Sequence, residues 1–261
     1  TRNPSYKYSF LGESGAPEHL GLISILEPSE CKLLQKSYKI KNDISGVEEE
    51  VQISRGFLLA KFAIADYSFS ILAAHLKDRS PHPDFNQFDM RRYEARQLRY
   101  SFDEIIKNAP DANVIIIGNF NDNCGMSPIK EIYARKYKNK KKLFDIRPID
   151  DLRTSWTYWN QNSDEYERIF YAMTSLNMLS EIDRTKTKIV MNESWTKIFN
   201  NRPLLISLKA NEMEEPSDSY VSAIYPNSIY SEIAAHFEKD KIIGEKPRRK
   251  SPKTAVEQKK E

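Results

Sequence analysis

The sequence has few cysteines and no long apolar run. Its two cysteines, Cys31 and Cys124, among 261 residues are too few for a disulfide framework, and no metal-type spacing links them. No apolar run approaches the ~20 residues that a membrane-spanning helix needs, so we expect no membrane partner. The chain starts at Thr1 rather than Met, which leaves open whether a signal peptide or a longer upstream segment precedes it. The sequence leaves the compartment undetermined.

Aromatic residues are plentiful by contrast. Hydrophobic residues make up 39% of the chain, with 14 Tyr, 12 Phe and 3 Trp, which supports a packed core in one large domain or two small ones. The net charge of +3 is uneven, because residues 245–261 hold seven Lys or Arg against three Glu. A second basic cluster at 135–142 is either the solvated end of a helix or a rim that attracts phosphate.

The stretch Val114-Ile-Ile-Ile-Gly-Asn-Phe-Asn-Asp122 organises the interpretation of the chain. Four consecutive β-branched residues lead into Gly118, a pattern typical of a strand buried on both faces. The polar residues that follow would lie at the carboxyl end of that strand, where sheets of α/β type usually place their chemistry. We therefore predict that residues 114–117 form a central strand.

Other segments indicate strands interleaved with helices. Strands are predicted at residues 20–26, 31–38, 47–53, 57–64, 67–74, 156–159, 169–175, 185–190 and 203–208. A hairpin turn is predicted at Asp66. Apolar residues recur at helical spacing over residues 86–108, a second helix is predicted to begin at Ser127, and residues 1–20 are interpreted as loop.

This arrangement predicts an α/β or α+β layered sandwich. We expect the folded domain to span residues 1–209. A linker and an amphipathic helix are expected at 210–244, and a basic disordered tail at 245–261.

Four short segments occur in an order that matches a known superfamily. They are His75-Leu-Lys, Gly118-Asn-Phe-Asn-Asp122, Tyr166-Glu-Arg-Ile-Phe-Tyr171 and Asn200-Asn-Arg-Pro203. In this order they resemble the motifs of the endonuclease/exonuclease/phosphatase superfamily, the deoxyribonuclease-I-like phosphoesterases, most of all its bacterial members. The resemblance covers roughly residues 20–209.

The resemblance implies a fold and a mechanism. The fold would be two packed mixed β-sheets flanked by helices in four layers, here without the family's N-terminal segment. Catalysis in the family takes place at one end of the sandwich on a divalent metal, usually Mg²⁺, which prefers carboxylate oxygens. A general-base His, oriented by an Asp, activates the water that attacks a phosphate ester.

This chain departs from the family pattern where the chemistry takes place. Family members usually have an Asp where this chain has Asn119, an Asp where it has Phe170, and Asp-His where it has Asn200 and Asn201. The family's metal-ligating Glu and a further Asn belong upstream of the matched segments. An amide keeps the shape of a carboxylate without its charge, and Asn201 cannot take up a proton near neutral pH.

Phe170 fits the same interpretation. Without a His partner, a buried carboxylate at this position would cost several kcal/mol, so an apolar residue is the stabilising choice. We therefore expect a catalytically impaired site that binds Mg²⁺ weakly or not at all.

The candidate site residues are expected to converge at one end of the sandwich. They are His75, Asn119, Asn121, Phe170, Asn200 and Asn201, and two arginines, Arg168 and Arg202, are candidate substrate-binding residues. By resemblance, His75 assists the leaving group or binds phosphate, and Asn121 binds phosphate or positions the nucleophile. Strand-end and turn roles explain these two residues equally well, and the two arginines either meet phosphate or pair with acidic neighbours.

Three functional hypotheses remain open from the sequence. The first is an impaired phosphoesterase-like protein that still binds nucleic acid or another phosphate ester. The second is a working Mg²⁺-dependent nuclease or phosphatase that uses substitute ligands or an upstream segment. The third is a structural interaction module, with a protein partner that the sequence does not identify.

Overall fold

The computed structural model describes residues 5–133, 143–191 and 200–213. The chain divides into two units, Thr1–Ser217 and Asp218–Glu261, and every described residue lies in the first. The basic cluster at 135–142, most of the expected linker and helix, and the basic tail lie outside the described residues. No helix within these ranges is long and apolar enough to cross a membrane.

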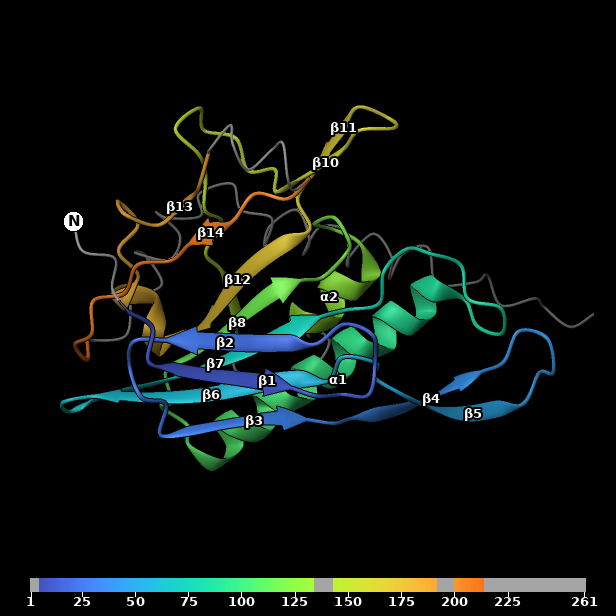
Figure 1. Ribbon diagram of the computed structural model, residues 1–261, viewed down its shortest axis with the longest axis horizontal. Coiled ribbons are helices and arrows are strands. Elements are labelled where there is room, and N and C mark those ends of the chain that lie inside the picture. Colours follow the sequence, from blue (N-terminus) through green and yellow to red (C-terminus); the bar gives the residue numbers. More distant parts are fainter. Residues whose placement is uncertain (1–4, 134–142, 192–199, 214–261) are drawn as a thin grey trace, which may run out of the picture. The chain divides into compact units, whose positions relative to one another are not determined.

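A six-stranded mixed sheet is the largest element of the first unit (Figure 1). Its strands, in spatial order, are β3 (Glu30–Leu34), β6 (Phe57–Ile64), β7 (Tyr67–His75), β8 (Val114–Asn119), β12 (Phe170–Ser175) and β9 (Leu143–Asp145). Strands β7 and β8 are parallel, and the other neighbours are antiparallel. Strand β8 lies inside the sheet, which confirms the central strand and the mixed α/β (α+β) class predicted from the sequence.

Four two-stranded sheets accompany the large one. They are β1 (Tyr8–Gly12) with β2 (Leu20–Ser24), β4 (Ser37–Lys41) with β5 (Glu48–Gln52), β10 (Tyr158–Asn160) with β11 (Glu165–Glu167), and β13 (Lys188–Ile189) with β14 (Leu204–Leu205). Among the described residues, the second layer of strands expected from the resemblance consists of such pairs. Strands β1 and β2 pack on the large sheet, where Phe10, Leu20 and Leu22 contact a cluster formed by Leu58, Ala60 and Phe62 of β6.

Two strand predictions are wrong in detail. Strand β1 lies within residues 1–20, where a loop was expected. It was missed because the alternation of half-buried Phe10 and exposed Leu11 is short and flanked by Pro and Gly. Residues 31–38 form parts of two strands rather than one. The first part, β3, pairs with β6 up to Leu34, and the second part, β4, pairs with β5.

The helices are α1 (Gln87–Asn108), α2 (Ser127–Tyr133) and the short 3₁₀ helix η1 (Asn177–Glu181). The helices α1 and α2 match the predicted positions, whereas the 3₁₀ helix η1 was not predicted. The side chain of Asn86 caps α1 by accepting hydrogen bonds from the backbone N–H groups of Phe88 and Asp89, at 2.9 and 3.2 Å, which satisfies two donors that the first turn leaves unpaired. Figure 1 shows α1 and α2 behind the large sheet and the β1–β2 pair in front of it.

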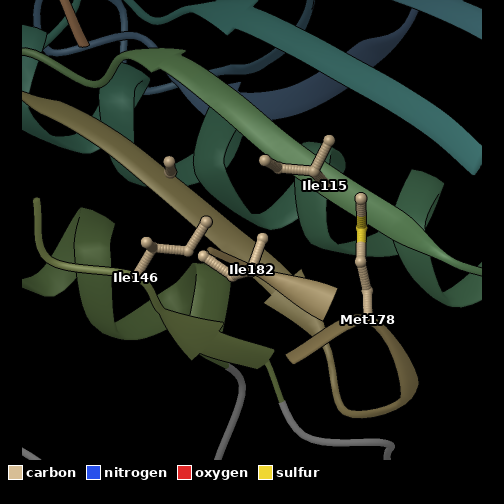
Figure 2. Packing of buried hydrophobic residues seen from close by; sticks show 5 residues of the cluster. Ile115, Ile146, Met178 and Ile182 are labelled. Atoms are coloured by element: carbon tan, nitrogen blue, oxygen red, sulfur yellow. The ribbon is translucent and has the colours of Figure 1, made fainter. Parts of the chain in front are cut away.

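A buried apolar cluster fixes the β8–β12 half of the sheet. Its members are Ile115, Ile146, Ala172, Met178 and Ile182. Figure 2 shows Ile115 of β8 and Met178 of η1 next to each other, with Ile146 and Ile182 beside β12. Burial of these side chains holds η1 against the sheet.

Gly118 is required where β7 and β8 meet near their carboxyl ends. It lies opposite Ala74 in the parallel register and has a φ of +147°. A Cβ atom at this position would lie 1.8 Å from the carbonyl oxygen of Ala74, which no side chain could accommodate. Glycine therefore permits the close pairing of β7 with β8 next to Asn119.

Candidate functional site

Three of the predicted site residues form one row across adjacent strands. His75 pairs with Asn119 between β7 and β8, and Asn119 pairs with Phe170 between β8 and β12. Strands β7 and β8 end side by side at this edge of the sheet (Figure 1). Residues separated by up to 95 positions in the sequence thus meet at one edge, as the motif order predicts.

Hydrogen bonds fix the polar members of this row. The backbone N–H of Asn121 donates to Asn119 Oδ1 at 2.9 Å, and Asn121 Nδ2 donates to the carbonyl of Leu76 at 2.8 Å. Asn119 Nδ2 then faces His75 Nε2 at 3.3 Å. Because an amide NH₂ only donates, Nε2 is the acceptor and the neutral imidazole carries its proton on Nδ1.

The surroundings of His75 favour that neutral form. Burial lowers the pKa of His75, and the charge of Arg55 lowers this pKa further, whereas Glu18 and Asp78 act in the opposite direction. A histidine with this lowered pKa is uncharged at neutral pH.

The fourth segment reaches the row through Thr157. Thr157 Oγ1 accepts hydrogen bonds from the N–H groups of Ile169 and Phe170, both at 3.0 Å, while the Thr157 carbonyl accepts from the N–H of Arg202 at 2.7 Å. Asn201 forms an isolated β-bridge with Tyr158. These contacts place residues 200–202 beside the start of β12.

The two asparagines of this segment have different surroundings. Asn200 is exposed, and its side-chain oxygen accepts a hydrogen bond from Gln161 at 2.8 Å. Asn201 Oδ1 is buried and has no partner within the described ranges. The structure therefore brings His75, Asn119, Asn121 and Phe170 together, and joins Asn201 to them through backbone contacts.

Arg168 and Arg202 both pair with buried carboxylates. Arg168 Nη1 donates to Asp145 Oδ2 at 2.7 Å, and the guanidinium carbon lies 4.4 Å from the ring centroid of Tyr171. Arg202 Nη2 donates to Asp150 Oδ2 at 2.6 Å. The sequence left open whether these arginines meet phosphate or pair with acidic neighbours. In the structure both pair with acidic neighbours.

Asp150 is stabilised in its charged form. Although burial opposes ionisation, hydrogen bonds from Thr154 and Arg202 lower the pKa of Asp150 to about 2. A phosphate group would have to displace this carboxylate to reach the Arg202 guanidinium.

Helix α1 clamps the ends of β7 and β8. Arg91 Nε donates to Asp122 Oδ2 at 2.8 Å, and Arg91 Nη1 donates to the carbonyls of Lys77 and Asp78 at 3.3 and 3.0 Å. Glu94 accepts from the N–H of Lys77 at 2.6 Å, and burial raises the pKa of Glu94 to about 7. These residues were missed because an Arg/Glu-rich helix predicts a solvated face, and only the strand ends beneath it explain their burial.

Arg55 and Glu18 are a second pair that sequence reasoning missed. Phe57 at the start of β6 pairs with Ala74, so the preceding residues come to the same edge of the sheet as His75. Arg55 Nε donates to Glu18 Oε2 at 3.0 Å, and the Arg55 side chain is only 11% exposed. A positive charge therefore lies near His75, where the family pattern would predict a negatively charged metal site.

The residues at this edge do not fit a divalent metal. The side chains of His75, Asn119, Asn121 and Phe170 offer an imidazole, two amides and a phenyl ring, whereas hard cations prefer carboxylate oxygens. The described part of the chain contains no group of three or more His, Cys, Asp or Glu that could hold a metal ion. The two carboxylates that lie deeper, Asp122 and Asp145, are engaged by arginines.

Comparison with known proteins gives structural similarity only. No protein-family model matches the chain, and no curated protein matches it. It is similar to an endonuclease/exonuclease/phosphatase family protein from Leptotrichia buccalis (TM-score 0.49, 10% identity, 80% of this chain and 72% of that one). It is also similar to the endonuclease/exonuclease/phosphatase from Bacteroides vulgatus (TM-score 0.48, 13% identity, 78% and 76%).

Beta toxin from Staphylococcus aureus is a third similar protein. One crystal structure, of beta toxin 275-280, gives a TM-score of 0.43 at 14% identity. The match covers 62% of this chain and 55% of that one. A second, of an F277A, P278A mutant with bound magnesium ions, gives 0.44 at 14% identity over 72% and 68%. Similarity at this level, with TM-scores below 0.5 and identities of 10–14%, transfers no reaction to this chain.

Proposed function

We propose that the chain belongs to the endonuclease/exonuclease/phosphatase superfamily and has lost metal-dependent hydrolysis while it retains binding of a phosphate ester or nucleic acid. The proposal rests on one observation above all. The row of His75, Asn119 and Phe170 offers an uncharged amide and a phenyl ring at positions where the family's mechanism needs carboxylates.

The chemistry of these replacements supports the proposal. Asn119 and Asn200 supply neutral oxygens where charge makes a metal bind tightly. Asn201 does not titrate near neutral pH, so it cannot serve as a general base. Loss of a positioned base or its orienting partner costs about 100- to 10,000-fold in rate, and groups that act as a unit fail together.

One observation favours a second candidate, a working enzyme with substitute ligands. Asn201 Oδ1 is a buried carbonyl oxygen without a described partner, and a buried acceptor of this kind is satisfied by a donor or a cation. An amide oxygen from Asn201 together with carboxylates from outside the described residues would then hold the metal. We rank this candidate second because the mostly buried cation of Arg55 at the same edge opposes a second positive charge.

Hydrolysis assays separate the two candidates. The unmodified chain and a restored variant (Asn119→Asp, Phe170→Asp, Asn200→Asp, Asn201→His) are incubated with Mg²⁺ and either bis-p-nitrophenyl phosphate or supercoiled plasmid DNA. We expect no turnover by the unmodified chain. Turnover that appears only in the restored variant, preferably with the upstream segment attached, would support the proposal. Turnover by the unmodified chain at rates typical of enzymes, about 10 per second, would overturn the proposal and favour the second candidate.

A further inference from the structure

Arg55 is a mostly buried arginine whose hydrogen-bonding capacity is only partly used. Its Nε and Nη2 both donate to one oxygen of Glu18, Oε2. Within the described ranges, its Nη1 donates to no group. Since a guanidinium has five N–H donors, Arg55 keeps donors for a further acceptor.

Three other buried arginines differ in this respect, and a fourth, Arg168, uses both Nη1 and Nη2 on Asp145. Arg91, Arg99 and Arg202 each bind backbone carbonyls as well as a carboxylate, and thereby hold separate segments together. The carboxylate that Arg55 contacts belongs to Glu18, whose side chain is 65% exposed. An ion pair with such an exposed partner is weak, because water and salt screen it, so Glu18 is an exchangeable counter-ion.

His75 provides a second donor at the same edge. Its Nε2 accepts from the Asn119 amide, so its Nδ1 carries the proton, and no described group accepts from it. Phe57 pairs with Ala74 between β6 and β7, so Arg55 and His75 lie at adjacent strand ends. After burial, the Arg55 charge is the second cause that lowers the His75 pKa.

Among the described cations at this edge, Lys77, Arg79 and Arg91 each pair with a carboxylate that is less exposed than Glu18. Lys77 Nζ is bonded to Asp78 Oδ1, and Glu94, which also interacts with Arg55, has a pKa raised to about 7 and so is largely protonated below that pH. Lys77 and Asp78 therefore neutralise each other, and the negative charge of Glu94 is reduced by its protonation.

We propose that Arg55 and His75 form a metal-independent binding site for the phosphate group of a phosphate ester, and that Glu18 is a built-in carboxylate which the phosphate displaces. The planar guanidinium fork matches two phosphate oxygens, and His75 Nδ1–H donates to a third. This inference rests on the proposed function, because that function gives the location of the site. At this site a guanidinium takes the place of the metal as the source of positive charge.

The test measures binding without any metal. A 5′-fluorescein-labelled single-stranded oligodeoxynucleotide is titrated with protein in EDTA and followed by anisotropy, with inorganic phosphate as competitor. We expect Arg55→Gln to weaken binding by about tenfold or more, the value of a lost charge-assisted hydrogen bond. We expect Glu18→Gln to tighten binding several-fold, because the competing carboxylate is gone.

Matched controls come from a second, partly buried ion pair. Arg96→Gln and Glu131→Gln make the same changes of charge in a pair that joins α1 to α2. Both are expected to stay within about twofold of the unmodified chain, since they change only the long-range field. Equal effects of Arg55→Gln and Arg96→Gln, or no tightening with Glu18→Gln, would overturn the inference.

The outcomes also separate this inference from the proposed function. Absence of binding by the unmodified chain and by Glu18→Gln alike refutes the anion site but leaves the loss of hydrolysis untouched. Mg²⁺-dependent turnover by the unmodified chain refutes the proposed function whatever Arg55 does in EDTA. If Arg55→Gln fails to fold, as judged by circular dichroism, the largely exposed Glu18→Gln still decides the question.

Discussion

Two neighbouring regions of the molecule treat charge in opposite ways. At the strand ends, the row of His75, Asn119 and Phe170 contains no carboxylate. Just beside it, three arginine–aspartate pairs are almost completely buried: Arg91–Asp122, Arg168–Asp145 and Arg202–Asp150. Carboxylates are thus present where they connect segments of the fold and missing where they would bind a metal.

The difference follows from what each carboxylate touches. Asp122 and Asp145 each have an arginine partner with fitted hydrogen bonds, which compensates for the loss of water around both charges. A carboxylate at position 119 or 170 would face His75 or a phenyl-lined edge with no such partner. Without a metal, the amide and the phenyl ring are the more stable choices there, and the four predictions below test this contrast from the largest expected effect to the smallest.

Asp145→Asn is expected to have the largest effect. It leaves the buried Arg168 charge unpaired, at a cost of about 3–5 kcal/mol in the free energy of unfolding. The measurement is urea unfolding followed by circular dichroism. The opposite exchange, Asn119→Asp, is the control, and we expect it to change the free energy by about 1 kcal/mol or less because the oxygen that accepts from Asn121 remains. Similar values for the two variants would remove the contrast between the regions.

Phe170→Asp is expected to destabilise the protein by about 1–3 kcal/mol at pH 7. A partly buried carboxyl without a partner has a raised pKa, so the part of the loss that comes from ionisation sets in above the ordinary Asp pKa of about 4 and vanishes below it. The part that comes from the lost phenyl contacts remains at both pH values. Urea unfolding at pH 4 and pH 7 measures this.

The same variant combined with Asn201→His shows whether the two positions form a unit. We expect the double variant to regain at least about 0.5 kcal/mol relative to additivity, because the imidazole would supply the missing partner. Strictly additive effects would mean that residues 170 and 201 lie too far apart to have formed an orienter–base pair.

Glu94→Gln tests the one carboxylate at this edge that is buried without a tightly bonded arginine. Its folded-state pKa of about 7 lies above the ordinary value, so ionisation is easier in the unfolded chain. Stability is therefore expected to fall as the pH rises from about 4.5 to 7, by about 1–3 kcal/mol from this group. The Gln side chain keeps an acceptor for the Lys77 N–H, so this fall should shrink in the variant. An unchanged pH profile in urea unfolding between pH 4.5 and 7 would contradict the assignment.

The sequence predicts the site row better than its surroundings, for a physical reason. His75, Asn119 and Phe170 end or begin strands with strong apolar patterns, so their meeting follows once those strands are paired. Arg55 and Glu18 lie in a short turn and in the β1–β2 connection. They meet only because the β1–β2 pair, with the missed strand β1, packs on β6. No local pattern encodes such a contact.

The burial of charged residues is equally hidden from local patterns. Arg91, Glu94 and Arg99 occur among apolar positions of α1 and have the spacing of a solvated helix face, yet all three are buried. Their hydrogen-bond partners are backbone groups at the end of β7 and in α2 that lie far away in the sequence. Helix periodicity predicts the element correctly and leaves this polar contact surface unseen.

The smallest effect is expected for Glu167→Gln, which breaks an ion pair at the border between the two regions. Arg79 Nη1 donates to both carboxylate oxygens of Glu167 at 2.9 Å, but the Arg79 side chain is 44% exposed. Because water can solvate the Arg79 charge once its partner is lost, we expect a loss of about 1 kcal/mol or less, and less still in 1 M salt. Urea unfolding at low and high salt, beside Asp145→Asn, provides the measurement. A loss as large as that of Asp145→Asn would mean that pairing itself, rather than burial of the paired charges, determines how strongly these arginines hold the fold.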